Sequence, residues 1–331
     1  MRIAVDAMGG DHAPQSIVAG VVEALNELKE VTQITLFGQE KAITNELARY
    51  QTKGLPIVIR DTKEIIEMHE SPAQAVKTKK DSSIVVAIKA LKQGEVDAFI
   101  SAGNTGAVMA GALMYPGRLK GIFRPAIATL IPTLSGASIL LDVGANVDCK
   151  PQHLLQFAIM GNVYAKDIMG KPNPKIGLLS IGEEEGKGNT LTSQTFDLLK
   201  HSSLNFIGNV EGRDIINGTV DVIVCDGFVG NVVLKFGESL AEMIISFLKQ
   251  ELSKSLSLKI GAFLSKPAFK KFKKLVDYSE YGGAPLLGID GVCIICHGAS
   301  SPKAVKNGIR VACEFINHQV NLHIEKGIKE G

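Results

Sequence analysis

The sequence predicts an α/β protein with a mostly parallel sheet that carries helices on both faces. Segments with the pattern of strands alternate with segments with the pattern of amphipathic helices along the whole chain. Several strand segments, such as residues 175–181, are apolar throughout, which is typical of strands buried on both faces. No stretch rich in Pro, Gly or Ser divides the chain. We therefore expect a single domain over residues 1–331.

The size and composition agree with this fold class. With 331 residues, 45% of them hydrophobic and 21% charged, the chain is typical of a soluble globular protein with a full core. The N-terminus Met1-Arg-Ile-Ala-Val-Asp6 resembles a first strand rather than a signal peptide. No apolar run reaches the roughly 18 residues of a membrane span. The five cysteines are then expected to be reduced thiols in a cytoplasmic protein.

The elements follow one another in a regular order. Strands are expected at residues 2–7, 33–38, 56–61, 97–101, 124–132, 138–142, 175–181, 205–210, 221–225 and, broken by two glycines, 286–297. Helices are expected at residues 16–29, 40–50, 83–92, 151–167, 190–200 and 232–252. A further helix should follow the turn at residues 102–106 and run through residue 114, and another should start at residue 301. Ser71-Pro-Ala-Gln74 has the form of a capping box at the start of a further helix.

A glycine-rich turn at residues 182–189 is a candidate anion site. It lies between a buried strand and a helix and contains Gly186, Lys187, Gly188 and Asn189. Backbone N–H groups at a helix N-terminus favour an anion, and Lys187 adds a full positive charge. An ordinary glycine loop with a solvated lysine is the alternative interpretation. The stretch matches neither the P-loop nor the dinucleotide fingerprint.

Other strand ends carry polar residues as well. The turns contain Asp6, Asp11, Asn104, Thr105, Asn146, Asp226 and Asn231. Each of these turns taken alone is explained by the turn-forming preference of Asn, Asp and Gly. If the strands are parallel, however, their carboxyl ends share one edge of the sheet, and these residues are expected to converge there with Lys187.

Cys293-Ile-Ile-Cys296-His297 matches the pattern of covalent haem attachment, but we interpret both cysteines as core residues. They lie in an apolar strand segment, where residues three apart face opposite sides. We expect His297 at the strand end near the site.

Residues 252–276 contain seven lysines and no acidic residue, which leaves 29 basic against 34 acidic residues in the rest of the chain. A general nucleic-acid surface is therefore not expected. The apolar residues of this segment follow a helical spacing; they are Leu252, Leu256, Ile260, Phe263, Leu264, Phe269 and Phe272. We expect a helical hairpin over residues 239–280. Its apolar face would contact a membrane surface, a twin subunit or both, rather than the core of the protein itself.

Taken together, these motifs resemble the PlsX family of bacterial phosphate acyltransferases. The matching segments span almost the whole chain in order; they are Asp6-Ala-Met-Gly-Gly-Asp11, Ser101-Ala-Gly-Asn-Thr-Gly106, Arg124-Pro-Ala126, Leu141-Asp-Val-Gly-Ala-Asn146, residues 182–189, Glu211-Gly-Arg-Asp214, Asp226-Gly-Phe-Val-Gly-Asn231, Tyr281-Gly-Gly-Ala-Pro-Leu-Leu-Gly288 and His297-Gly-Ala-Ser300. Ala299 stands where Gly or Ser is expected, which is a mild departure.

The resemblance implies a Rossmann-like three-layer α/β/α sandwich, similar to the isocitrate and isopropylmalate dehydrogenases. It implies transfer of a fatty acyl group from acyl carrier protein to inorganic phosphate, which gives acyl phosphate for phospholipid synthesis. It also implies a homodimer that associates peripherally with the inner face of the cell membrane, where a membrane glycerol-3-phosphate acyltransferase is the expected downstream partner. No cofactor and no metal are expected.

In the family, the residues that match Lys187 and Asn231 are implicated in the active site. We therefore expect Lys187 and Asn231 to be catalytic. The expected substrate-binding residues come from the other turns; they are Asp6, Gly10, Asn104, Thr105, Gly106, Asn146, Gly186, Gly188, Asn189, Asp226, Gly230 and His297. Phosphate is itself the nucleophile, so the protein has to supply positioning and charge stabilisation.

Three alternatives remain from the sequence. A nicotinamide-dependent dehydrogenase of similar fold would form NAD(P)H, and a phosphotransacetylase would prefer an acyl-CoA donor. A membrane scaffold without enzymatic activity would bind lipid without turnover, but it leaves the glycine turns unexplained.

Overall fold

The computed structural model describes residues 1–330, and the side chains of all of these except residues 273–276 and 278. Within this range all strands join one sheet in the order β3-β2-β1-β4-β11-β10-β5-β6-β9-β7-β8. The strands are β1 (Arg2–Asp6), β2 (Gln33–Gly38), β3 (Ile57–Asp61), β4 (Ala98–Ser101), β5 (Ala126–Thr133), β6 (Gly136–Leu141), β7 (Ile176–Leu179), β8 (Phe206–Val210), β9 (Val222–Val224), β10 (Ala284–Leu287) and β11 (Val292–Ile295).

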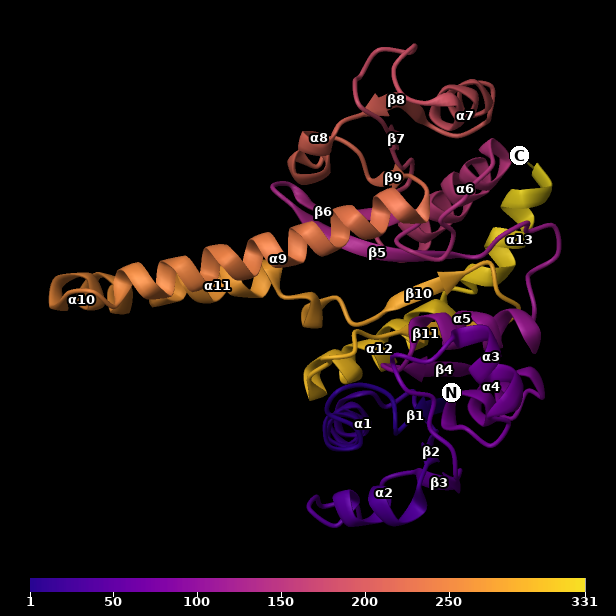
Figure 1. Ribbon diagram of the computed structural model, residues 1–331, viewed down its shortest axis with the longest axis vertical. Coiled ribbons are helices and arrows are strands. Elements are labelled where there is room, and N and C mark those ends of the chain that lie inside the picture. The colour runs from indigo at the N-terminus through magenta and orange to yellow at the C-terminus, as the bar shows by residue number, and fades with distance from the viewer. Residues whose placement is uncertain (331) are drawn as a thin grey trace.

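Helices cover both faces of this sheet (Figure 1). They are α1 (Gln15–Glu27), α2 (Glu40–Leu47), α3 (Pro72–Thr78), α4 (Ser83–Lys92), α5 (Thr105–Met114), α6 (Pro151–Asp167), α7 (Thr190–Lys200), α8 (Gly212–Asn217), α9 (Gly227–Leu252), α10 (Leu256–Leu264), α11 (Lys266–Val276), α12 (Pro302–Asn317) and α13 (Val320–Glu330). One core lies on the face with α1, α6 and α12, and a second core lies on the face with α4, α5 and α8. The prediction of a mostly parallel α/β sheet is confirmed.

The expectation that all strand ends share one edge of the sheet is wrong. β10 pairs antiparallel with both β11 and β5, and β5 pairs antiparallel with β6. Three reversals separate the two parallel blocks, so β3-β2-β1-β4-β11 runs opposite to β6-β9-β7-β8. The turns after β1, β4 and β11 therefore lie at one edge of the sheet, and the turns after β6, β7 and β9 lie at the other edge.

Three local predictions are corrected as well. The segment 286–297 forms two antiparallel strands, β10 and β11, with Gly288 and Gly291 in their connection at positive φ. The helix expected from residue 301 breaks into α12 and α13 at Gln319, whose φ is 54°. Ser71 precedes α3 without a side-chain hydrogen bond, so the capping box does not form there.

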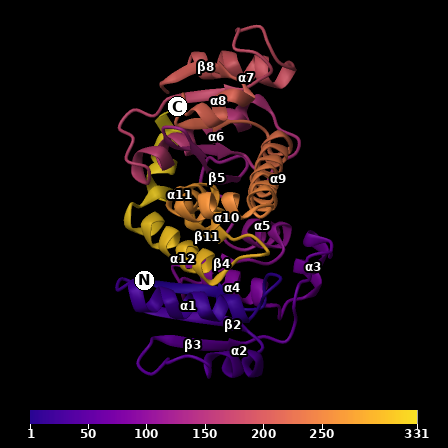
Figure 2. The same ribbon diagram turned by 90° about the vertical axis from the view of Figure 1, so that its left-hand side faces the viewer.

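Helices α9, α10 and α11 extend away from the sheet (Figure 1). α9 starts at the sheet, α10 lies at its far end, and α11 returns beside it. In the turned view these three helices lie between the two halves of the molecule (Figure 2). Because only Gly227 and Gly230 of α9 are fully buried, most of this helix is surrounded by solvent. The side chains of Lys273 and Lys274, two of the seven lysines of residues 252–276, lie outside the described residues.

Candidate active site

The turn after β1 is held by a buried carboxylate. Asp6 is 1% exposed and accepts hydrogen bonds from Ser101 Oγ at 2.7 Å and from the Met8 N–H at 3.1 Å. Burial raises the pKa of Asp6, while these hydrogen bonds oppose the rise. At Gly10 φ is +101°, and a Cβ there would lie 2.8 Å from the Gly298 carbonyl oxygen. The close contact between the turns after β1 and β11 therefore requires glycine.

Asn104 fixes the start of α5. Its Oδ1 accepts from the Ala107 N–H at 3.0 Å, which makes it the N-cap of the helix. Its Nδ2 donates to the carbonyls of Glu67, Met68 and Glu70 at 3.1–3.3 Å. Asn104 thus fastens the 67–70 loop to the helix. Thr105, the next residue, is exposed at the helix start, and Gly106 packs against Pro72.

Asp142 organises the opposite edge of the sheet. Its Oδ1 accepts from the N–H groups of Ile127, Gly144 and Ala145 at 3.0–3.2 Å. Its Oδ2 accepts from the backbone N–H and the side-chain Nδ2 of Asn146 at 2.7 and 2.9 Å. Burial raises the pKa of Asp142, and these donors oppose the rise. Sequence reasoning assigned Asn146 to the site and left out Asp142, although both stand in one motif after a strand.

The first turn of α9 is built on this cluster. The Asp226 side chain caps the helix by accepting from the Val229 N–H at 2.9 Å, and the Gly227 N–H donates to the Asn146 carbonyl at 2.7 Å. A Cβ at Gly230 would lie 1.9 Å from the Asp142 carbonyl oxygen. The helix can therefore pack this closely only with glycine at residue 230. Asn231 follows directly and is exposed.

The 182–189 turn lies after β7, which is two strands from β6. Gly188 has a φ of +115°, and the Asn189 side chain accepts from the Thr192 N–H at 2.9 Å, so it caps α7. Gly186 and Lys187 are exposed. Gly188 thus needs glycine for its backbone conformation, whereas Gly186 has no positive φ and no neighbour within 4 Å of an added Cβ. Lys187 belongs to the same edge of the sheet as Asn146 and Asp226, but it does not line the cavity described next.

A cavity of about 570 Å³ lies between α9 and the sheet. The polar residues of its lining, here called the polar part of the cavity, include Thr105, Asn231, Lys235, Glu238 and His297. The rest is mainly apolar and comes from β5, α8 and α9; it includes Ile127, Ile131, Ile215, Leu234 and Ile244. A concave, largely apolar pocket with a few grouped polar side chains is typical of a small-molecule site. Thr105 comes from one edge of the sheet and Asn231 from the other, so the cavity joins residues of both parallel blocks.

Two nitrogen groups face each other at the polar part of the cavity. Lys235 Nζ lies 3.5 Å from His297 Nε2. Nδ1 of His297 accepts from the Ala299 N–H at 3.2 Å, which places the proton of a neutral ring on Nε2. Both groups are then donors, an arrangement suited to an anion. Glu238 Oε2, which also lines the cavity, accepts from Lys235 Nζ at 3.3 Å, so an anion would share Lys235 with this carboxylate. Sequence reasoning did not assign Lys235 to the site. It could have been found from its spacing, because Lys235 follows Asn231 by four residues and therefore lies on the same side of α9.

The cysteines near this site are buried or partly buried. Cys293 belongs to the core on one face of the sheet and Cys296 to the core on the other, which confirms that they face opposite sides. Burial raises the pKa of both thiols to about 12. Cys149 Sγ contacts the Asn146 carbonyl, and burial followed by the nearby Asp142 raises its pKa to about 12.

The comparison with protein families identifies the chain. The family described as "Fatty acid synthesis protein" matches residues 1–323. The chain belongs to this family. Members that are named phosphate acyltransferase include a protein of Geotalea uraniireducens (strain Rf4), 57% identical over 330 residues that cover 100% of this chain and 95% of the relative. Another, from Dictyoglomus turgidum, is 54% identical over 332 residues, which cover 100% of this chain and 98% of the relative. The family is the PlsX family that the sequence motifs indicate.

Two solved structures share the fold. A phosphotransacetylase from Streptococcus pyogenes has a TM-score of 0.61 at 17% identity and covers 96% of this chain and 94% of its own. A branched-chain phosphotransacylase from Enterococcus faecalis V583 has a TM-score of 0.61 at 15% identity. The match covers 96% of this chain and 99% of that protein. At these identities the likeness concerns the fold alone. Within the described residues, none of the helices has the length and apolarity that a membrane span requires.

Proposed function

We propose that this protein transfers a fatty acyl group from acyl carrier protein to inorganic phosphate, and so makes acyl phosphate for phospholipid synthesis. The cavity beneath α9 carries the proposal, because it combines donor groups with a long apolar lining. This is the layout that an acyl thioester requires, with a reacting carbonyl at the polar part and an alkyl chain in the apolar part. Membership of a family with phosphate acyltransferases supports the same reaction.

The reaction needs no nucleophile from the protein. A phosphate oxygen attacks the thioester carbonyl, the new C–O bond forms, and the carbonyl oxygen becomes an oxyanion. The C–S bond then breaks, and the carrier thiolate leaves and takes up a proton. The protein's contribution is to hold phosphate and to stabilise the oxyanion. Asn231 Nδ2, Lys235 and His297 Nε2 are the donors at the polar part of the cavity.

We assign a phosphate-holding role to Lys187 and to the amides of residues 186–189. The exposed ammonium of Lys187 supports this role. The Lys187 N–H donates to the Glu184 carbonyl at 3.0 Å and the Asn189 N–H to Thr192 Oγ1 at 2.9 Å, so these two amides would have to exchange their present acceptors for phosphate. Asp6, Gly10, Asn104, Gly106, Asn146, Asp226 and Gly230 would then act through the backbone, since each one caps, anchors or allows a close contact of a turn. Thr105 and His297 line the cavity themselves.

The remaining parts of the proposal concern assembly. The exposed apolar side chains Phe228, Val232, Phe236, Met243 and Phe247 form a stripe along α9 that a second copy of the chain would cover. The tip of α10 and the lysine-rich α11 would contact anionic lipid at the inner face of the membrane, where the downstream acyltransferase takes the product. All of this is assigned to one domain over residues 1–331, with the protruding helices as an extension over residues 239–280.

The deciding experiment incubates the purified protein with acyl-acyl carrier protein and phosphate in the presence of hydroxylamine. We expect phosphate-dependent acyl hydroxamate. Lys187→Ala and Asn231→Ala should each lower the rate by about 10²–10³-fold, the usual effect of losing one such donor. Lys53→Ala, an exposed lysine on a distant loop, is the matched control.

Product with acyl-CoA but none with acyl carrier protein would identify a phosphotransacetylase instead. No product with either donor would contradict the proposed reaction. Full activity of Lys187→Ala would remove Lys187 from the site and leave the reaction itself in place.

A further inference from the structure

The sheet divides into a fork beside the proposed active site. β10 pairs with β5 at Leu286–Ile127 and Leu287–Ala126, whereas β5 continues to Thr133. Pro285 has no N–H to donate, and the chain before β10 passes through Gly282 at a φ of +90°. β10 thus turns away from β5, and the outer half of β5 keeps β6 as its partner on the other side.

The cavity beneath α9 passes into this fork. Its lining on the α9 side comes from one core and includes Ile127, Ile131 and Ile215. The same cavity is also lined by Ile139 and Tyr164 of the core on the opposite face, and by Leu130, which packs against that core. A cavity that stayed on one face of a closed sheet would not contact side chains of both faces, because neighbouring residues of a strand alternate between them. The cavity therefore extends through the sheet.

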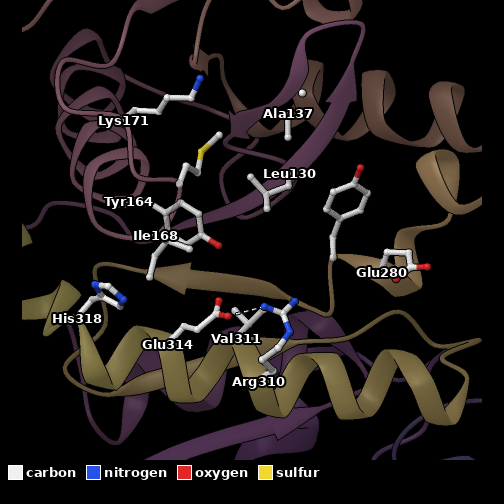
Figure 3. Close-up of a pocket in the computed structure, with 13 residues that line it drawn as sticks. Leu130, Ala137, Tyr164, Ile168, Lys171, Glu280, Arg310, Val311, Glu314 and His318 are labelled. Carbon is white, nitrogen blue, oxygen red and sulfur yellow. Dashed lines mark hydrogen bonds and ion pairs between the residues drawn. The ribbon is translucent and has the colours of Figure 1, made fainter.

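A second cavity, of about 510 Å³, lies on the far side of the fork (Figure 3). The two cavities share Leu130, Tyr164 and Tyr281. In Figure 3, Leu130 of β5 and Tyr164 of α6 lie across this cavity from Arg310 and Glu314 of α12. Arg310 Nη1 forms an ion pair with Glu314 Oε1 at 2.5 Å, and Lys171 and His318 also line the space.

The two cavities differ in what they can hold. An alkyl chain gains free energy in the apolar first cavity by leaving water. In the second cavity it would displace water from Lys171, Arg310 and Glu314, which costs free energy, although the apolar side chains of Ala137 and Ile168 line this space as well. The boundary between the two cavities is therefore where an alkyl chain should stop.

We propose that the acyl chain of the substrate enters the fork with its methyl end toward α6, and that Leu130, Tyr164 and Tyr281 form the wall that sets the longest chain accepted. The inference rests on the proposed function, and it adds where the chain lies and what limits its length. The three wall residues act on specificity and are remote from the reacting carbonyl.

The test measures kcat/KM for phosphate-dependent acyl phosphate formation with a graded series of saturated acyl donors. Leu130→Ala opens the wall and should move the length limit to longer chains, whereas Leu130→Trp should move it to shorter ones. Each methylene gained or lost should change the relative kcat/KM by about tenfold or more, as in other apolar pockets. Leu130→Val, one methylene smaller, gives the same test if Leu130→Ala does not fold.

Ala137 provides a test of the far side of the wall. It lines the second cavity and not the first. Ala137→Trp alone should leave the chain-length profile unchanged. In the Leu130→Ala background it should block the newly opened space and restore the original profile. Ile207→Ala on β8, 47% exposed and outside both cavities, is the matched control.

The outcomes separate the two proposals. If the unaltered protein shows no phosphate-dependent turnover with any donor, the proposed function fails before the variants matter. If the unaltered protein is active but Leu130→Ala and Leu130→Trp keep its chain-length profile, the acyl chain lies elsewhere. The assignment of Leu130, Tyr164 and Tyr281 as the wall would then be wrong. A shorter chain-length limit in Ala137→Trp alone would also contradict the assignment of the wall. It would mean that the acyl chain already extends past the wall into the second cavity of the unaltered protein.

Discussion

Lys235 lines the cavity of the proposed site, although the sequence did not indicate it. On an amphipathic helix a lysine has the pattern of a solvated side chain, and its position opposite His297 depends on a contact between residues far apart in the chain. Lys235→Met removes the charge and keeps the length of the side chain. We expect kcat/KM for phosphate to fall by about 10²–10³-fold, as for loss of one anion-stabilising donor.

The control for this prediction is Lys249→Met, an exposed lysine on the same helix. Steady-state rates at varied phosphate concentration measure the effect. Equal phosphate dependence in Lys235→Met and Lys249→Met would exclude Lys235 from phosphate binding.

Cys149 and Cys225 both lie beside the polar cluster at the start of α9, and Cys149 is the more accessible of the two. The chemistry of Cys149 therefore distinguishes direct attack from a covalent acyl-enzyme. Because its pKa is raised to about 12, the nucleophilic thiolate is almost absent at neutral pH. We therefore expect Cys149→Ala to retain turnover within about twofold, since surface and near-surface substitutions of this kind usually change little. Mass spectrometry after mixing with acyl donor should show no thioester on the protein. An acylated Cys149 together with an inactive Cys149→Ala would contradict direct attack by phosphate.

The start of α9 is the part of the fold that places Asn231. Gly230→Ala would bring a methyl group to within 1.9 Å of the Asp142 carbonyl oxygen unless the helix moves. We expect a loss of about 1–3 kcal/mol in the free energy of unfolding, as for other overpacked sites, and a lower kcat because Asn231 shifts with the helix. Gly261→Ala in α10 meets nothing within 4 Å and should keep both quantities or gain stability. Unfolding in denaturant and initial rates would measure the two effects, and an unchanged Gly230→Ala would show that the contact relaxes at no cost.

Local patterns predicted several elements well, because they depend on neighbouring residues. The bounds of α4, α6 and α7 agree with those predicted from periodicity and capping residues. Strand direction is different, since a buried apolar strand has the same pattern whichever way it runs. The reversal at β10 and β5 was therefore not predictable from residues 284–287 or 126–133.

The opposite directions of the two parallel blocks explain why the predicted site residues divide into two groups. Turns at one edge supply Thr105 and His297, and turns at the other edge supply Asn231. α9 brings the two groups together. It starts at the Asp142 cluster, and one turn beyond Asn231 its Lys235 lies next to His297. The sequence thus indicated the right kinds of residues at strand ends, whereas their meeting place depends on a long helix crossing the face of the sheet.

The protruding helices α9, α10 and α11 are the part of the molecule that we expect to contact a lipid surface. Leu256, Phe263 and Leu264 of α10 are 75%, 73% and 73% exposed, and residues 252–276 carry lysines without acidic residues. Apolar side chains beside lysines favour vesicles that contain anionic lipid, and added salt should weaken the attraction.

Leu256→Glu places a negative charge in this surface and should shift the protein from the vesicle pellet to the supernatant in a sedimentation assay. Leu322→Glu on α13, where the leucine is 45% exposed, should sediment like the unaltered protein. Because Leu256 lies outside both cavities, turnover in solution should stay unchanged, so equal sedimentation of the two variants would argue that α10 does not contact the membrane.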